Sequence, residues 1–224
     1  MEDISMSDSA KVPSSLDGIN VIMQGSPSPL SPEGEHQSKN AKKDPIVEWN
    51  LNKAAVSRFA KDSNWPEALK TLKMLSTKHR NKEVYKALAM RVWICLKSDA
   101  TVDEVVLSLF HLLNTLGAKH EVAGPIAALA HLMAKNRTPD HADRDLAMGQ
   151  SQQMFNMICE NHKIIGEEAF HKWVAANKLE DPNHYIPIVM NCLDIMVGDD
   201  WWFDREQLQN EMEAANAKKL AANS

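Results

Sequence analysis

Histidine is the residue whose number and spacing in this chain most readily suggest chemistry. Beyond residue 100 there are seven: His111, His120, His131, His141, His162, His171 and His184. The first four stand about ten residues apart, but Gly117, Gly124 and Pro139 separate them into different elements. The segment HEVAG (120–124) also lacks the second histidine that a zinc-binding helix carries at i+4. The spacing therefore supplies no local pair of metal ligands.

Two further patterns contain metal-binding residue types. Glu168 and His171 form the i, i+3 pair of carboxylate-bridged di-iron bundles, but a second such pair exists only at 33–36, in a polar stretch. We therefore interpret Glu168 and His171 as a surface pair. His141, Asp143 and Asp145 in DHADRD are interpreted as the acidic start of a helix. We expect no metal and no cofactor, and a helical metal or cofactor protein using the histidines is the alternative hypothesis.

Signatures of catalytic nucleophiles are missing from the sequence. It contains no Gly-x-Ser-x-Gly, no phosphate-binding glycine loop and no dinucleotide fingerprint. Cys95, Cys159 and Cys192 lie in apolar stretches without a CxxC spacing, so we expect three reduced thiols in the core. These observations predict a protein that is not an enzyme.

Composition and charge narrow the location and the class of partner. The acidic N-terminus MEDISMSDSA has no apolar signal region, and no apolar run reaches the length of a membrane span. We expect a soluble, cytoplasmic protein. The net charge of −5 disfavours nucleic-acid binding, and the one basic cluster, within 70–82, is interpreted as a solvated helix face.

The first 44 residues differ in composition from the rest of the chain. Residues 1–44 include SPSPLSPEGEHQSKNAKKD and are predicted to form a disordered Ser/Pro-rich tail, followed by a single all-helical domain over 45–224. One apolar segment interrupts the tail, GINVIMQG, with Ile19, Val21 and Ile22. It is either an anchor that docks on a partner or on the domain, or a chance apolar patch.

Helical periodicity dominates from Pro45 onward, and we expect an all-α fold of about nine helices in antiparallel hairpins. The clearest is VDEVVLSLFHLLNTLG, with an i, i+3, i+4, i+7 stripe, Asp99 or Thr101 as N-cap and Gly117 at its end. Asn64 is the expected cap of NWPEALKTLKMLSTKH. EVYKALAMRVWICLK is apolar on nearly all sides, which predicts a central helix. The architecture is predicted to be solenoid-like or an irregular bundle.

One part of the chain resembles a known repeat family. In AAVSRFAKDSNWPEALKTLKMLSTKHRNKEVYKALA, small residues (Ala55 and Ala60) stand where two helices would cross, the step NWPEAL opens the second helix, and Asn81 follows in the turn. This pattern, over about residues 50–116, resembles tetratricopeptide-type helical hairpins. The resemblance implies a scaffold or adaptor that binds protein partners.

The segment GDDWWFD (198–204) places three large aromatic residues between acids. We expect Gly198 to end one helix and Asp199 or Asp200 to cap the last one. Because successive helical residues point about 100° apart, at least one of Trp201, Trp202 and Phe203 is expected to stay partly exposed. The segment is either a corner that holds the fold together or a docking surface. Our candidate partner-binding residues are Asp199, Asp200, Trp201, Trp202, Phe203, Ile19, Val21 and Ile22.

The expected function is a non-enzymatic adaptor or scaffold subunit that binds protein partners in a heteromeric assembly. One concrete form is an adaptor or chaperone-like component of a bacterial machine such as a secretion system. A regulatory nucleic-acid binder is a third hypothesis, which the acidic balance disfavours.

Overall fold

The computed structural model describes residues 44–78, 83–137 and 142–222, and within these ranges the chain forms nine α-helices and no strand. The predicted all-α fold is thereby confirmed. The expected tail, with the candidate anchor Ile19, Val21 and Ile22, lies outside the described residues. The helices are α1 (Pro45–Lys61), α2 (Trp65–Lys78), α3 (Val84–Lys97), α4 (Val102–Leu116), α5 (Ala123–Arg137), α6 (Ala142–His162), α7 (Glu167–Ala176), α8 (Pro182–Val197) and α9 (Arg205–Ala222).

Capping residues set several of these boundaries as the sequence predicts. The Asn64 side chain accepts a hydrogen bond from the Glu67 amide (3.4 Å) at the start of α2. Thr101 does the same for the Glu104 amide (3.4 Å) at the start of α4. Gly117 ends α4 with φ of 91°, a conformation that favours glycine because it has no Cβ. Polar side chains therefore satisfy amides that a helix start leaves unpaired.

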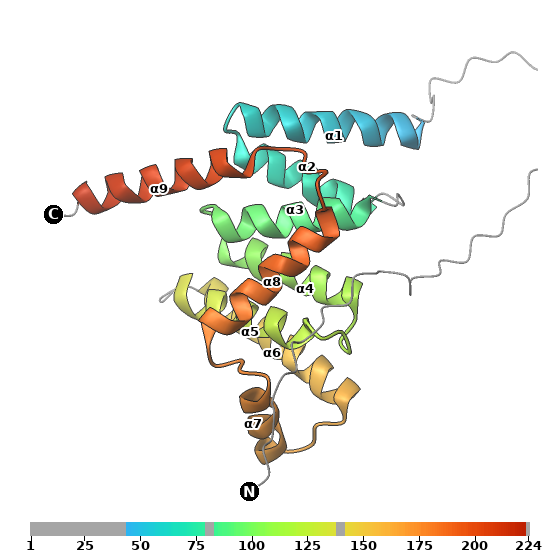
Figure 1. Ribbon diagram of the computed structural model, residues 1–224, viewed down its shortest axis with the longest axis vertical. Helices are drawn as coiled ribbons and strands as arrows, with labels where there is room; N and C mark the ends of the chain where they lie inside the picture. The colour runs from blue at the N-terminus through green and yellow to red at the C-terminus, as the bar shows by residue number, and fades with distance from the viewer. Residues whose placement is uncertain (1–43, 79–82, 138–141, 223–224) are drawn as a thin grey trace, which may run out of the picture. The chain divides into compact units, whose positions relative to one another are not determined.

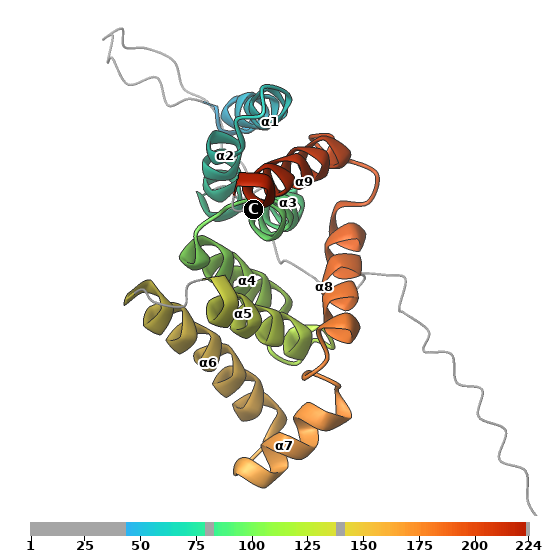
Figure 2. The same cartoon turned by 90° about the vertical axis from the view of Figure 1, so that its left-hand side faces the viewer.

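Helix α3 lies at the centre of the described domain, as its lack of a polar face predicts. All residues from Ala87 to Cys95 are buried, and α3 packs against α2, α4, α8 and α9. Figures 1 and 2 show these helices on different sides of α3. Burial of so much apolar surface makes α3 the main contributor to the core.

The connectivity favours an irregular bundle over an open solenoid. Consecutive helices pack against each other from α1 to α6. Helix α8 then returns along the domain and packs against both α3 and α5 (Figure 1). Because each unit of a solenoid contacts only its neighbours, a helix that bridges distant units departs from that architecture.

Helix α7 is packed differently from the others. It has no buried residue, and it contacts the domain through partly buried side chains such as Phe170 and Trp173 (Figure 2). Lys163 and Gly166 before it and Lys178 after it have positive φ angles. No helix in the described part of the chain is both long and apolar enough to cross a membrane.

Candidate functional site

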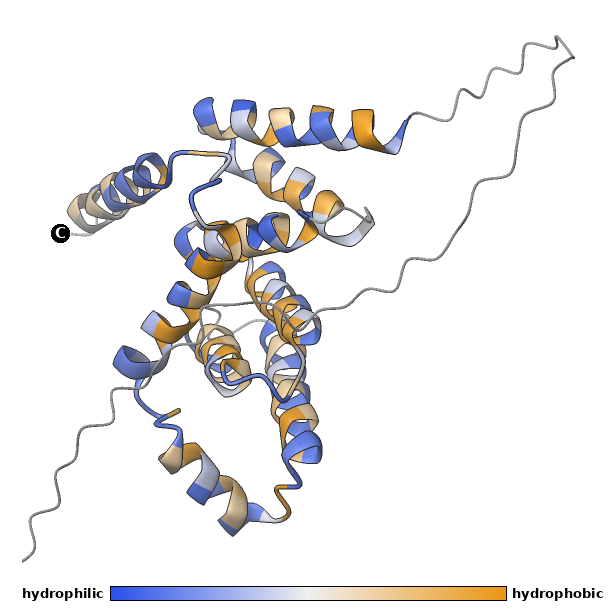
Figure 3. Cartoon of the chain, turned by 45° about the vertical axis from the view of Figure 1, so that its right-hand side comes forward, coloured by the Kyte–Doolittle hydropathy of each residue, from blue (hydrophilic) through white to orange (hydrophobic). Residues whose placement is uncertain are grey.

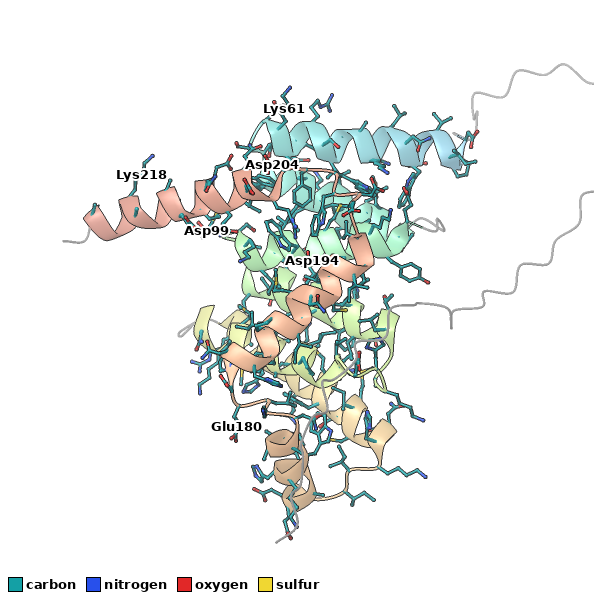
Figure 4. All side chains as sticks on the ribbon, viewed as in Figure 1. Lys61, Asp99, Glu180, Asp194, Asp204 and Lys218 are labelled. Carbon is teal, nitrogen blue, oxygen red and sulfur yellow. The ribbon has the colours of Figure 1, made fainter. Side chains whose placement is uncertain are left out.

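The GDDWWFD segment connects α8 to α9 without being helical itself. Gly198 ends α8 with φ of 62°, as expected. The predicted capping of α9 by Asp199 or Asp200 is wrong. The carboxylate of Asp204 accepts hydrogen bonds from the amides of Glu206 (2.9 Å) and Gln207 (3.4 Å), so it is Asp204 that caps α9 (Figure 4).

The three aromatic residues of the segment join three tryptophans from the N-terminal helices. Trp202 meets Trp49 of α1 edge-on, with ring centroids 6.1 Å apart. Phe203 contacts Trp65 of α2 (5.8 Å) and Trp93 of α3 (5.9 Å), and Trp93 also contacts Trp201 (5.8 Å). We call this group the aromatic corner. Its members are Trp49, Trp65, Trp93, Trp201, Trp202 and Phe203.

Burial divides the three aromatics of the connecting segment. Trp202 and Phe203 are buried (5% and 8% exposed), whereas Trp201 is half-buried, so the expectation of at least one partly exposed ring is met. Helical spacing does not explain this exposure, because the segment is not helical. All three rings contact the domain. The guanidinium of Arg205 also lies over Trp201, 4.3 Å from the ring centre.

The acids of the segment have separate roles. Asp199 is exposed in the turn after α8. Asp200 forms ion pairs with Lys86 of α3 (2.8 Å) and Lys53 of α1 (3.5 Å). The hydrogen bond from Lys86 and the charges of both lysines hold the pKa of Asp200 below its ordinary value. Asp200 thus connects α1, α3 and the segment beside the aromatic corner.

Polar contacts also attach the first turns of α9 to the α1–α2 hairpin. Glu211 accepts hydrogen bonds from Ser63 Oγ (2.6 Å) and Trp65 Nε1 (2.6 Å). Gln207 Nε2 donates to the carbonyl of Ala60 (3.1 Å). Burial would raise the pKa of Glu211, but the hydrogen bonds that it accepts outweigh burial and lower it. These bonds fix the direction in which α9 leaves the domain.

An open groove lined by several elements of the described domain lies next to the aromatic corner. It has a volume of about 540 Å³ and is bounded by α2, the α3–α4 connection, the start of α4 and Met212 of α9. Its apolar lining includes Trp65, Leu69 and Ala100. We call it the α2–α9 groove. The corner builds this groove, because Phe203 supports Trp65 and the connecting segment sets the position of α9.

A buried charge network lies behind one end of the groove. The fully buried Arg91 of α3 donates to Glu104 through Nε (3.2 Å) and Nη2 (2.8 Å), and its Nη1 lies 3.1 Å from Nδ1 of His111. Lys73 of α2 pairs with the other oxygen of Glu104 (2.9 Å). The network therefore ties α2, α3 and α4 together through one carboxylate.

The protonation states in this network suit a structural role. Burial would raise the pKa of Glu104, but hydrogen bonds and charges from Lys73 and Arg91 outweigh burial and lower it. Burial and the positive charges of Arg91 and Lys73 lower the pKa of His111. A carboxylate held ionised by two cations is poorly suited to exchange protons near neutral pH, where a general acid or base must do so. Glu104 is therefore better placed to orient Arg91 and Lys73.

Neither the groove nor the charge network follows from the motifs of the sequence. One signal for the network was present, because Arg91 is the only charged residue between Ala87 and Leu96. A lone arginine inside an apolar helix requires a buried partner. The sequence contains no comparable signal for the groove, because the lining residues Leu69, Ala100 and Met212 come from three separate segments.

The histidine and cysteine candidates are dispersed in the described domain. Among the described residues, no group of three or more His, Cys, Asp or Glu side chains is placed to hold a metal ion. The His171 side chain is 65% exposed and lies 3.5 Å from Glu167, and Glu168 pairs instead with Lys172, which agrees with a surface position. His141 lies outside the described residues.

Two of the three cysteines are core residues. Cys95 and Cys192 are buried, and burial together with the charge of Glu121 raises the pKa of Cys192 to about 11. Cys159 is only half-buried, so the expectation that all three lie in the core is wrong for this residue. It lies near the C-terminal end of α6, and burial raises the pKa of its thiol as well. A thiol with a raised pKa is a poor nucleophile.

Known proteins provide no guide to the site. No family model matches the sequence, no curated protein matches it, and no solved structure matches the fold.

Proposed function

We propose that this chain is a non-enzymatic adaptor that binds a protein partner in the α2–α9 groove, as one subunit of a larger assembly. The observation that carries the proposal is the groove itself, an open apolar hollow of about 540 Å³. Exposed apolar surface of this kind is a feature of interaction sites, because water covers it unfavourably.

The lining of the groove supports binding better than catalysis. Trp65, Leu69 and Met212 supply apolar contact area. Trp65 and Leu69 are buried (8% and 9% exposed) and form the floor of the groove, whereas Met212 is half-buried and methionine adapts its shape to a partner. Of the charged groups, Glu104 and Lys73 neutralise each other at 2.9 Å. We place the adaptor in the cytoplasm, because three cysteines without a CxxC spacing, two of them buried in the core, fit a reducing compartment.

Affinity capture with the full-length chain tests this proposal. The unmodified chain, a groove-filling variant Ala100→Trp, and Met212→Glu from the opposite wall are each used to capture proteins from lysate of the source cells. Ala54→Trp is the matched control, since Ala54 is exposed on α1, an element that does not line the groove. Circular dichroism and melting first establish that each variant is folded.

The expected result is one or more proteins captured by the unmodified chain and by the control, and lost from both groove variants in quantitative mass spectrometry. The same capture by Ala100→Trp and Met212→Glu as by the unmodified chain would overturn the assignment of the groove. Capture of nothing by any form would argue against an adaptor function altogether.

A further inference from the structure

Helix α7 is attached to the described domain through apolar side chains. Phe170 meets Phe155 of α6 edge-on, with ring centroids 5.7 Å apart, and Trp173 is also partly buried against the core. The ion pairs that α7 makes among the described residues stay within the helix, as that of Glu168 with Lys172 does. Few contacts therefore have to break for α7 to leave the domain.

The closest of these contacts is that of Trp173 with the backbone of α5. Gly124 is buried at the start of α5. A Cβ atom added at this position would lie 3.2 Å from two atoms of the Trp173 indole and 3.2 Å from the Leu179 side chain. The ring thus lies directly against the glycine, a close approach that the absence of a side chain allows.

The two ends of the α7 segment are anchored to one short stretch of the chain. At the end of α6, Nε2 of His162 lies 3.2 Å from the carbonyl oxygen of Ala118, in the α4–α5 connection. After α7, the buried Leu179 packs against Gly124. Residues 163–178 therefore leave the domain and return to it at neighbouring points, with α7 between them (Figure 1).

The backbone turns between these anchors at residues with positive φ angles. Lys163 (56°) and Gly166 (85°) precede α7, and Lys178 (51°) follows it. Residues other than glycine are strained in this conformation, so the two lysines do not by themselves favour the observed turns. The packing of α7 on the domain has to maintain these turns.

From these features we infer that residues 163–178 form a hinged flap, which swings away from α5 and α6 while the rest of the described domain stays folded. The contact of Trp173 with Gly124 is the latch that holds the flap closed. Opening uncovers an apolar surface that includes Phe155, which is 9% exposed when the flap is closed. The domain can thus conceal or present this surface without unfolding.

This inference is independent of the proposed function. No lining residue of the α2–α9 groove belongs to 163–178. Loss of the flap would therefore leave the groove in place, and loss of binding in the groove would leave the flap in place.

Hydrogen exchange in the full-length chain reports the opening, because a helix of 10 residues is marginal in water and loses its hydrogen bonds once it is detached. Gly124→Val opens the latch by placing a side chain where the Trp173 ring lies. Gly149→Val is the matched control, since Gly149 is an exposed glycine of α6 with no atom within 4 Å of an added Cβ. Trp173→Ala removes the latch from the flap side and provides the same test if Gly124→Val does not fold.

We expect Gly124→Val and Trp173→Ala to speed exchange of the α7 amides at least about tenfold more than they speed exchange of the α3 amides. Gly149→Val should show no such difference. The amides of α8, and those of α6 before His162, should keep their protection. Anilinonaphthalene sulfonate, a dye that binds exposed apolar surface, should bind both latch variants and not the control.

Three results would overturn the inference. Exchange of α7 that is no faster in the latch variants than in Gly149→Val would show that Trp173 does not hold the flap closed. Loss of protection in α6 or α8 together with α7 would show that 163–178 is not a separate unit. Rapid exchange of α7 without binding of the dye would show that opening uncovers no apolar surface.

Discussion

Two aromatic clusters in this domain have similar ring contacts but very different surroundings. The aromatic corner contains five of the six tryptophans and draws on α1, α2, α3 and the segment before α9. The other cluster, which we call the α7 end, consists of Phe155 of α6 with Phe170 and Trp173 of α7. Ring centroids in the corner are 5.7 to 6.1 Å apart, and those at the α7 end are 5.7 and 6.1 Å apart.

The difference lies in burial and in long-range polar contacts. Trp202 and Phe203 are buried, and Asp200 next to them pairs with lysines of two other helices. At the α7 end, Phe170 and Trp173 are only partly buried, and the ion pair of Lys172 with Glu168 stays within α7. Aromatic contact geometry alone therefore does not define a rigid region. A region is rigid when its rings are buried and its contacts connect distant elements.

Helix α1 also has apolar side chains on its surface. The first turn of α1 is coloured mainly as hydrophobic in Figure 3, where Ile46 and Val47 are exposed, and Leu51 is exposed in the next turn. Trp49, Val56 and Ala60 of the same helix are buried. Exposed apolar side chains at a terminal helix are common and indicate no particular site by themselves.

Trp202→Ala should give the largest loss of stability, about 3–5 kcal/mol in urea unfolding, because it removes a buried ring from the junction of several elements. Trp202→Phe is the control. It keeps an aromatic ring and removes an Nε1–H that is buried without a hydrogen-bond partner among the described residues, so it should cost less than about 1.5 kcal/mol. A loss from Trp202→Ala no larger than that from Trp173→Ala would refute the contrast between the two clusters.

Trp173→Ala should cost less, about 1–2 kcal/mol, because Trp173 is only partly buried. We further expect the amides of α7 to exchange through local opening, with little dependence on denaturant, while those of α3 exchange only on global unfolding. Hydrogen exchange at several low urea concentrations measures both. Equal urea dependence for α7 and α3 would show that α7 is part of the rigid core.

Asp200→Asn should reduce stability by about 0.5–1 kcal/mol at neutral pH, a small figure because the carboxylate is 45% exposed. Since the pKa of Asp200 is lowered in the folded state, its contribution is present above the unfolded pKa of about 4 and is lost as the pH falls through the folded value. The variant and the unmodified chain should therefore converge in acid. Asp199→Asn is the matched control and should leave the free energy of unfolding at neutral pH unchanged, because Asp199 is exposed.

Glu168→Gln should have the smallest effect, below about 0.5 kcal/mol. The Glu168–Lys172 pair is shorter (2.6 Å) than the Asp200–Lys86 pair (2.8 Å), but both of its side chains are more than three-quarters exposed. Chemical unfolding of the two variants side by side makes the comparison. A larger loss from Glu168→Gln than from Asp200→Asn would mean that distance, and not the elements connected, determines the strength of these pairs.

The sequence predicted local features of the candidate site better than its assembly. The end of α8 at Gly198 followed from a local rule, whereas the partly exposed aromatic was predicted from a helical spacing that the segment does not have. The cap of α9 was misassigned by a few residues, because the segment has three acids and every one is a chemically suitable cap. Asp200 does not cap α9 but forms ion pairs with Lys53 and Lys86. Both lysines are more than 100 residues away in the chain.

By itself the sequence determined the helices, because apolar periodicity and capping residues act over a few positions and require no distant partner. It also determined that α3 is central, since a helix without a polar face must be covered. Only the tertiary structure decided that GDDWWFD packs against Trp49, Trp65 and Trp93, and that a groove opens beside it. The physical reason is that ring packing, ion pairing and hollow surfaces depend on how distant elements meet, and a local pattern of residues does not specify this.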